Sequence, residues 1–205
     1  MFDAHAADGL LIAAALAGES EAFAPLVRRY QAALLRAAIS RLGRRQWAEE
    51  AVQETFLCAH KWLPSYDSRY SFRTWLWTIL LNQCSRLAKR EQRQPAATPA
   101  EFEPPCPAAS PLAQLLARES SERLHGLLSQ LPQVQADALR LRFFGELTFP
   151  EIAAAMEISE PGAKHRVKTG LLKLSEWLGA SAVNASARAG ETSVPREVGK
   201  SGVGI

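Results

Sequence analysis

Hydrophobic residues recur every three or four positions along most of the chain, and this spacing is typical of amphipathic helices. In the first half of the chain the pattern predicts a helix that begins after Ser20, its expected N-cap, and ends at Gly43. A second helix ends before Pro64, and a third begins at Ser71. We therefore expect a first helical domain at residues 8–91.

The second half repeats the helical pattern and adds clear capping signals. Thr148 and Glu151 have the spacing of a capping box, with a proline in the first turn of the helix that follows. Soon afterwards Ser159 can cap another helix, which also has a proline in its first turn. Two short capped helices joined by so tight a turn predict a helix-turn-helix within a second domain at residues 112–178.

Two stretches lack the helical pattern. Residues 92–111 are rich in proline, alanine and serine, which indicates a flexible linker. Residues 179–205 are small, polar and glycine-rich, so we expect a disordered tail. The predicted fold is all-α: two small helical domains joined by a Pro/Ala-rich linker, the second a helix-turn-helix domain.

Composition narrows the function only slightly. The chain has 205 residues and a net charge of +3, which does not by itself indicate a nucleic-acid partner. Cys58, Cys84 and Cys106 form no CxxC pair, so we expect no metal site, no cofactor and no disulfide framework. The longest apolar run is too short to span a bilayer, and the N-terminus does not resemble a signal peptide. We therefore expect a soluble, cytoplasmic protein.

Charge is distributed unevenly on the predicted helices. The second helix presents a partly acidic face away from its apolar side, made of Glu50, Gln53, Glu54 and Leu57. Such a face suits a basic partner helix, but it is equally typical of an ordinary solvated surface. This pattern alone leaves both interpretations open.

The third helix combines basic and aromatic residues. Between residues 71 and 93 five basic side chains stand against one acid, and Tyr66 and Tyr70 lie just before them. Its helical phase predicts a buried Trp75 and an exposed side that consists of Arg73, Thr74, Trp77, Asn82, Arg86, Lys89 and Arg90. Cations neutralise phosphates and rings stack on unpaired bases, so this helix favours single-stranded nucleic acid.

The second helix of the helix-turn-helix presents basic residues near its start. Its outward positions include Lys164, His165, Arg166 and Lys168, whereas Ala163, Val167, Leu171, Leu174 and Leu178 are expected to face inward. A recognition helix places such N-terminal residues in the major groove of DNA. The sequence does not distinguish phosphate contacts from base contacts among them.

These segments together resemble a known family. The stretch AEEAVQETFL at residues 48–57 closely resembles the polymerase-binding helix of sigma region 2. Residues 66–67 and 71–76, with Asn82, look like its promoter-melting continuation, and residues 131–166 look like region 4. Regions 1 and 3 have no apparent counterpart. The chain is therefore similar to the extracytoplasmic-function (ECF) group of the sigma-70 family.

The resemblance implies a non-enzymatic protein that gives RNA polymerase its promoter specificity. Glu50, Gln53, Glu54 and Leu57 would bind the clamp helices of the largest subunit of core polymerase, and the second domain would contact the beta flap. The melted −10 strand would be bound by residues of the first domain: Tyr66, Asp67, Tyr70, Ser71, Arg73, Trp77, Asn82, Arg86, Lys89 and Arg90. Double-stranded −35 DNA would be bound by residues of the helix-turn-helix: Ser159, Lys164, His165, Arg166 and Lys168.

Two further expectations concern partners and alternatives. By analogy with the family, an anti-sigma factor would mask these surfaces, and any membrane contact would come through that partner. A stand-alone helix-turn-helix regulator is the alternative function, although it leaves the acidic face and the aromatic-basic helix of the first domain unexplained. An enzyme would need a nucleophile with its base or a metal cluster, and the sequence shows neither pattern.

Overall fold

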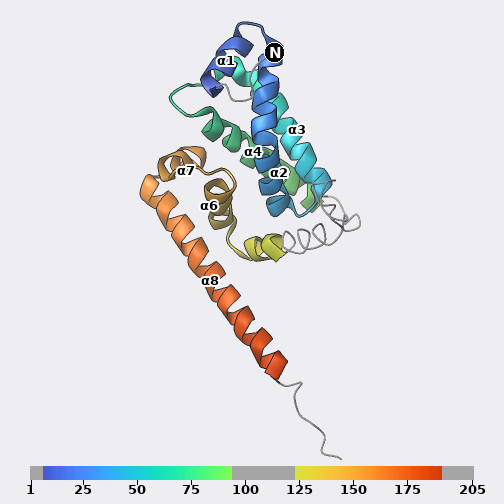
Figure 1. Ribbon diagram of the computed structural model, residues 1–205, viewed down its shortest axis with the longest axis vertical. Helices are drawn as coiled ribbons and strands as arrows, with labels where there is room; N and C mark the ends of the chain where they lie inside the picture. Colours follow the sequence, from blue (N-terminus) through green and yellow to red (C-terminus); the bar gives the residue numbers. More distant parts are fainter. Residues whose placement is uncertain (1–6, 94–122, 191–205) are drawn as a thin grey trace, which may run out of the picture.

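The computed structural model describes residues 7–93 and 123–190, and within them the side chains of residues 7–90 and 123–178. These residues form helices and no strand, as the sequence predicts. The first lobe, residues 7–93, contains α1 (Asp8–Leu16), α2 (Phe23–Leu42), α3 (Arg45–Trp62) and α4 (Phe72–Arg93), with short 3-10 turns at Ser20–Ala22 and Leu63–Ser65. The second lobe, residues 123–190, contains a helix at 123–130 followed by α6 (Gln133–Phe143), α7 (Phe149–Ala155) and α8 (Glu160–Gly190) (Figure 1).

In the first lobe, α2, α3 and α4 pack side by side and α1 lies across one end of the bundle (Figure 1). Gly43 ends α2 in the left-handed conformation, with φ +70°, as its place in the sequence predicts. Ser71 caps α4 by accepting a 3.1 Å hydrogen bond from the Thr74 amide. The predicted start of α2 was wrong, because Ser20 lies in a 3-10 turn and α2 begins at Phe23 without a side-chain cap.

The predicted helix-turn-helix is present as α7 and α8. Thr148 and Glu151 form the complete capping box of α7, with the Thr148 amide donating to the Glu151 carboxylate at 2.8 Å. Ser159 accepts a 3.3 Å hydrogen bond from the Gly162 amide at the start of α8. Both local capping signals in the sequence therefore form as predicted.

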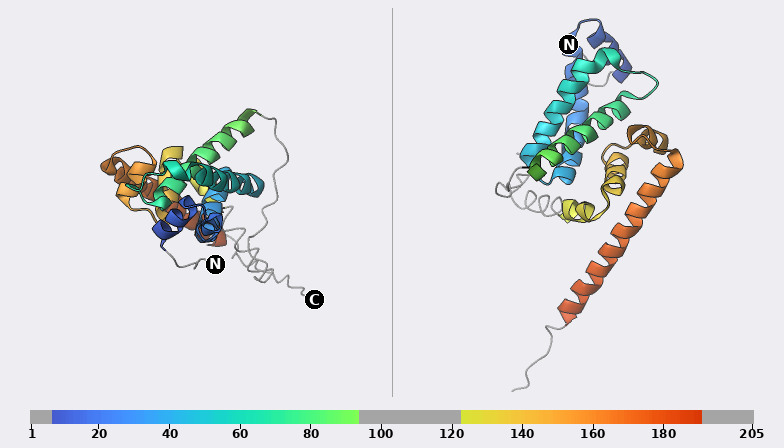
Figure 2. Two further views of the ribbon diagram at one scale, coloured as in Figure 1. Left: turned by 90° about the horizontal axis from the view of Figure 1, so that it is seen from above. Right: turned by 180° about the vertical axis from the view of Figure 1, so that it is seen from behind.

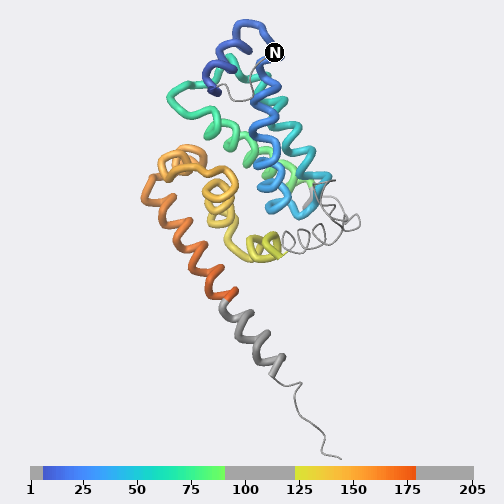
Figure 3. Tube along the Cα trace, viewed as in Figure 1, coloured from blue at the N-terminus to red at the C-terminus, as the bar shows by residue number. Residues whose placement is uncertain are grey.

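The helix α8 extends beyond the rest of the second lobe (Figures 1 and 3). It continues to Gly190 instead of ending at Leu178, so residues 179–190 of the predicted disordered tail are helical, whereas residues 191–205 lie outside the described part. The expectation that Leu171 and Leu178 face inward was wrong, because they are 42% and 44% exposed. The packing on α8 comes mainly from α6 and α7. Residues 94–111 of the predicted linker also lie outside the described part.

The two lobes pack against each other, and buried charged groups join them. Figure 2 shows the two lobes from two further sides. Arg140 on α6 is 3% exposed and donates to the Ser40 carbonyl oxygen at the end of α2, at 2.7 Å. His125 Nδ1 lies 2.9 Å from the same oxygen. Asp137 forms ion pairs with Arg140 at 3.0 Å and with Arg41 at 2.9 Å. Residues of the second lobe thus satisfy an α2 carbonyl that the helix itself leaves unpaired.

A second interlobe contact corrects the predicted face of α4. Trp77 was expected to be exposed but is 1% exposed, and Thr74 is 3% exposed. The turn between α6 and α7 covers Trp77 so closely that a Cβ atom at Gly145 would lie 2.9 Å from Cε2 of the indole. Trp75, expected to be core, is only partly buried. The spacing of apolar residues within α4 predicts which side faces the first lobe. It cannot predict that the second lobe packs on the opposite side and buries Trp77.

The buried charges at the lobe interface lead to a stability prediction. Replacing Asp137 by Ala leaves the guanidinium groups of Arg41 and Arg140 buried without a carboxylate, which we expect to cost about 3 kcal/mol. The packed arrangement should weaken, so the melting temperature falls and the radius of gyration measured by small-angle X-ray scattering rises. The control is Asp67→Ala, which removes an exposed ion pair with Arg69 and should change neither quantity. A melting temperature and radius equal to wild type for Asp137→Ala would contradict this role.

Candidate functional site

The acidic stripe of α3, made of Glu50, Gln53, Glu54 and Leu57, borders an apolar groove. Leu57 is 64% exposed and stands at the edge of a groove of about 570 Å³ between α2 and α3. The groove is lined mainly by apolar and aromatic side chains: Phe23, Val27, Val52, Phe56, Leu57 and His60, with Gln31 and Gln53. A helix with mixed basic and apolar side chains fits such a surface. The sequence predicts the stripe but not the groove, because the groove forms only where two helices pair.

The stripe is also paired with the basic side of α4. The Arg90 guanidinium donates to both carboxylate oxygens of Glu50, at 2.8 and 2.7 Å, and Arg86 contacts Glu54 at 3.3 Å. The hydrogen bond from Arg90 lowers the pKa of Glu50. The two surfaces that the sequence predicts for different partners are therefore neighbours and partly neutralise each other. Sequence spacing could not reveal this, since the residues are 32 and 40 positions apart.

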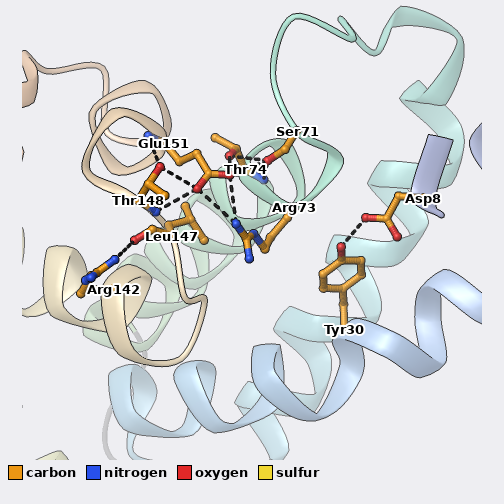
Figure 4. Close-up of polar contacts among 9 residues, drawn as sticks. All are labelled: Asp8, Tyr30, Ser71, Arg73, Thr74, Arg142, Leu147, Thr148 and Glu151. Carbon is orange, nitrogen blue, oxygen red and sulfur yellow. Dashed lines mark hydrogen bonds and ion pairs between the residues drawn. The ribbon is translucent and has the colours of Figure 1, made fainter. Parts of the chain in front are cut away.

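The start of α4 holds a carboxylate from the second lobe (Figure 4). The Ser71 hydroxyl donates to Glu151 at 2.9 Å, and the Arg73 guanidinium reaches both Glu151 oxygens at 3.1 and 3.2 Å. The Thr74 hydroxyl is 3.3 Å away from the same carboxylate. Burial on its own raises the pKa of Glu151, but the hydrogen bonds from Thr148, Ser71 and Arg73 outweigh it and lower the pKa to about 2. Glu151 is therefore ionised in this position.

In the loop before α4, some of the residues predicted to bind nucleic acid are packed against the protein and others are exposed. The Tyr66 ring packs on Trp75 with centroids 5.1 Å apart, and its hydroxyl donates to the Tyr70 carbonyl at 2.6 Å. Tyr70 is 51% exposed, and Asp67 pairs with Arg69 on the surface. Of the remaining predicted residues, four are exposed along α4: Asn82, Arg86, Lys89 and Arg90. Cations and an accessible ring thus lie on one lobe, whereas Trp77 is covered.

The helix-turn-helix presents most of its predicted DNA-binding residues to solvent. Lys164, His165 and Lys168 are exposed and Arg166 is partly buried near the start of α8. Lys164 forms an exposed ion pair with Glu160 at 2.7 Å. This end of α8 lies beside α7 and away from the extended C-terminal part of the helix (Figure 1). The arrangement suits contacts between a helix start and DNA phosphates.

None of the described helices is both long and apolar enough to cross a membrane. Within the described residues there is also no cluster of three or more His, Cys, Asp or Glu side chains arranged to hold a metal ion.

Comparisons with known proteins agree on one family. A family model for sigma-70 region 2 matches residues 26–94, and a model for sigma-70 region 4 matches residues 121–174. The chain is 30% identical to the RNA polymerase sigma-H factor of Pseudomonas aeruginosa over 159 residues, 73% of this chain and 82% of that protein. It is also 30% identical to the RNA polymerase sigma factor CnrH of Cupriavidus metallidurans over 187 residues, 85% of this chain and 95% of that protein.

A solved structure, CnrH in complex with the cytosolic domain of CnrY, has 28% identity and a TM-score of 0.68, covering 87% of this chain and 99% of that chain. Regions 2 and 4 correspond to the first and second lobes, and the two matched segments together span more than half of the 205 residues. The chain therefore belongs to the sigma-70 family of RNA polymerase sigma factors, in its extracytoplasmic-function group.

Proposed function

We propose that this protein directs promoter-specific transcription initiation in the cytoplasm by binding core RNA polymerase together with the −10 and −35 elements of promoters. The observation that carries the proposal is the presence of both family regions, each with its own candidate binding surface. The acidic stripe and its groove lie on the first lobe, and the basic start of α8 lies on the second. A stand-alone regulator would need only the second of these surfaces.

Core polymerase would bind along α3. Glu50 and Glu54 would contact basic residues of the clamp helices. Leu57, at the edge of the apolar groove, would contact apolar residues of the same partner. Both carboxylates already hold arginines of α4, so a basic partner would exchange with Arg90 and Arg86. Those two cations would then be available for the phosphates of the melted strand.

Promoter DNA would contact both lobes. On the first lobe the exposed Tyr70 would stack on an unpaired base of the −10 element, and Asn82, Arg86, Lys89 and Arg90 would follow the backbone. On the second lobe Ser159, Lys164, His165, Arg166 and Lys168 would enter or border the major groove of the −35 element.

An anti-sigma factor is a further proposed partner. The solved CnrH structure contains the cytosolic domain of CnrY, and this chain carries exposed apolar side chains that a partner would cover. On the second lobe they include Phe143, 59% exposed, beside a small apolar pocket of about 150 Å³ between the helix 123–130, α6 and α8. Exposed apolar patches of this kind mark interaction surfaces. The beta flap of core polymerase would use the same lobe.

The direct test is reconstitution of the purified chain with core bacterial RNA polymerase, followed by run-off transcription from a library of random promoters. Transcripts that depend on the added chain and share two upstream elements would establish the function. DNA binding without polymerase association or initiation would instead support the stand-alone regulator.

The polymerase-binding stripe leads to a paired prediction. We expect Glu50→Ala to weaken binding to core polymerase about tenfold, since it removes a carboxylate from the interface. The matched control is Arg90→Ala, which breaks the same internal ion pair but leaves Glu50 for the polymerase. This control should bind core as tightly as wild type or more tightly. Equal losses for both variants in a binding titration would mean that the internal pair matters and the proposed interface does not.

The helix-turn-helix leads to a prediction about salt dependence. Replacing Lys164 and Arg166 by Ala removes two cations near the start of α8, so binding to duplex −35 DNA should weaken. The slope of log affinity against log salt should fall by about 2, because fewer counterions are released. Arg123→Ala, an exposed cation outside the helix-turn-helix, is the control and should leave the slope unchanged. An unaltered slope in the double variant would remove these residues from the DNA interface.

A further inference from the structure

The start of α4 is built to bind an oxyanion. Ser71 and Thr74 present hydroxyl groups there, Arg73 presents a guanidinium, and the site lies at the N-terminus of a 22-residue helix. The group that fills this cradle comes from 77 to 80 positions further along the chain, in the other lobe. The carboxylate of Glu151 accepts hydrogen bonds from all three side chains (Figure 4).

Glu151 uses its two carboxylate oxygens differently. Oε2 accepts from the Thr148 amide at 2.8 Å and completes the capping box of α7. Oε1 accepts from Ser71 and Thr74, neither of which belongs to α7 or its cap. Only the first interaction is needed for the local structure of α7. The second interaction, together with the ion pair to Arg73, places a negative charge beside Ser71 and Arg73, which are proposed to bind the −10 strand.

We propose that Ser71, Arg73 and Thr74 form a binding site for a phosphodiester group of the −10 strand, and that Glu151 occupies this site as an internal competitor while the lobes are packed together. This inference rests on the proposed function. It adds that the part of the −10 surface at the start of α4 is closed by Glu151, whereas the rest of that surface is open. A carboxylate and a phosphate both accept bidentate hydrogen bonds from arginine, so one replaces the other in the same cradle. The second lobe must then leave the start of α4 before DNA binds there.

The neighbouring contacts support this competition. The turn at Gly145 and Leu147 that covers Trp77 belongs to the same part of the second lobe as Glu151, so both leave α4 together. Around Glu151 the contacts between lobes are hydrogen bonds and an ion pair with Arg73, whose side chain is 33% exposed. Water and phosphate can replace such contacts at lower cost than apolar ones. The contact at Glu151 can therefore be exchanged for a phosphate, although opening the site also uncovers the buried Trp77.

The test uses Glu151→Gln in the full-length chain without polymerase. Glutamine at this position keeps the capping box but lacks the charge that holds Arg73, so α7 should stay folded and the packed state should weaken. Binding of a labelled single-stranded DNA of random sequence is measured by fluorescence anisotropy. Because apparent affinity scales with the fraction of open molecules, we expect an increase of about tenfold over wild type. Circular dichroism checks that the helical content is unchanged.

Two further variants make the result specific. Glu157→Gln makes the same change in net charge at an exposed position of the helix-turn-helix and should leave the affinity unchanged. Arg73→Ala added to Glu151→Gln should cancel the increase, because the phosphate then loses its main ligand in the cradle. An equal increase with Glu157→Gln, or no increase with Glu151→Gln, would overturn the inference.

Run-off transcription with core polymerase separates this inference from the proposed function. If wild type initiates at specific promoters but Glu151→Gln binds single-stranded DNA no better than wild type, only the competition is refuted. If Glu151→Gln gains affinity and Arg73→Ala cancels the gain, but no variant supports initiation, the anion site stands and the proposed function is refuted.

Discussion

The end of α2 and its unpaired carbonyl group determine how the two lobes meet. The Ser40 carbonyl oxygen receives the Arg140 guanidinium and lies 2.9 Å from His125 Nδ1, both from the second lobe. Arg140 is buried, so it needs a carboxylate, and Asp137 supplies one that is shared with Arg41 of α2. These requirements place α6 against the first lobe in one orientation. The cover over Trp77 and the contact between Glu151 and Arg73 both follow from that orientation.

On each candidate binding surface of the first lobe, charged side chains already form ion pairs with other residues of the same chain. Glu50 and Glu54 hold Arg90 and Arg86, while Arg73 holds Glu151. A partner would therefore exchange ion pairs instead of adding charges to a bare surface. Exchange of the exposed pairs at Glu50 and Glu54 costs little free energy, because water and salt already screen them. The arrangement favours partners of opposite charge: a basic partner for the carboxylates of α3 and an anionic partner for the arginines of α4.

The candidate site could be predicted only in part. The stripe on α3 and the basic start of α8 follow from helical spacing, because both depend on which residues share one face of one helix. Trp77 shows the limit of this reasoning: its phase points away from the first lobe, yet the second lobe buries it. Glu151 was assigned only a capping role by its sequence context. Its contact with Arg73 joins residues 78 positions apart, and no local pattern encodes such a pair.

Local signals in the sequence are enough to predict the all-helical fold, the helix-turn-helix with its caps, and the family to which the chain belongs. These depend on local spacing, on capping chemistry and on motifs read along the chain. Tertiary packing brings the lobes together, covers Trp77, and places Glu151 in the cradle at Ser71, Arg73 and Thr74. The physical reason is that burial and ion pairing between lobes depend on distances through space, which helical periodicity does not contain.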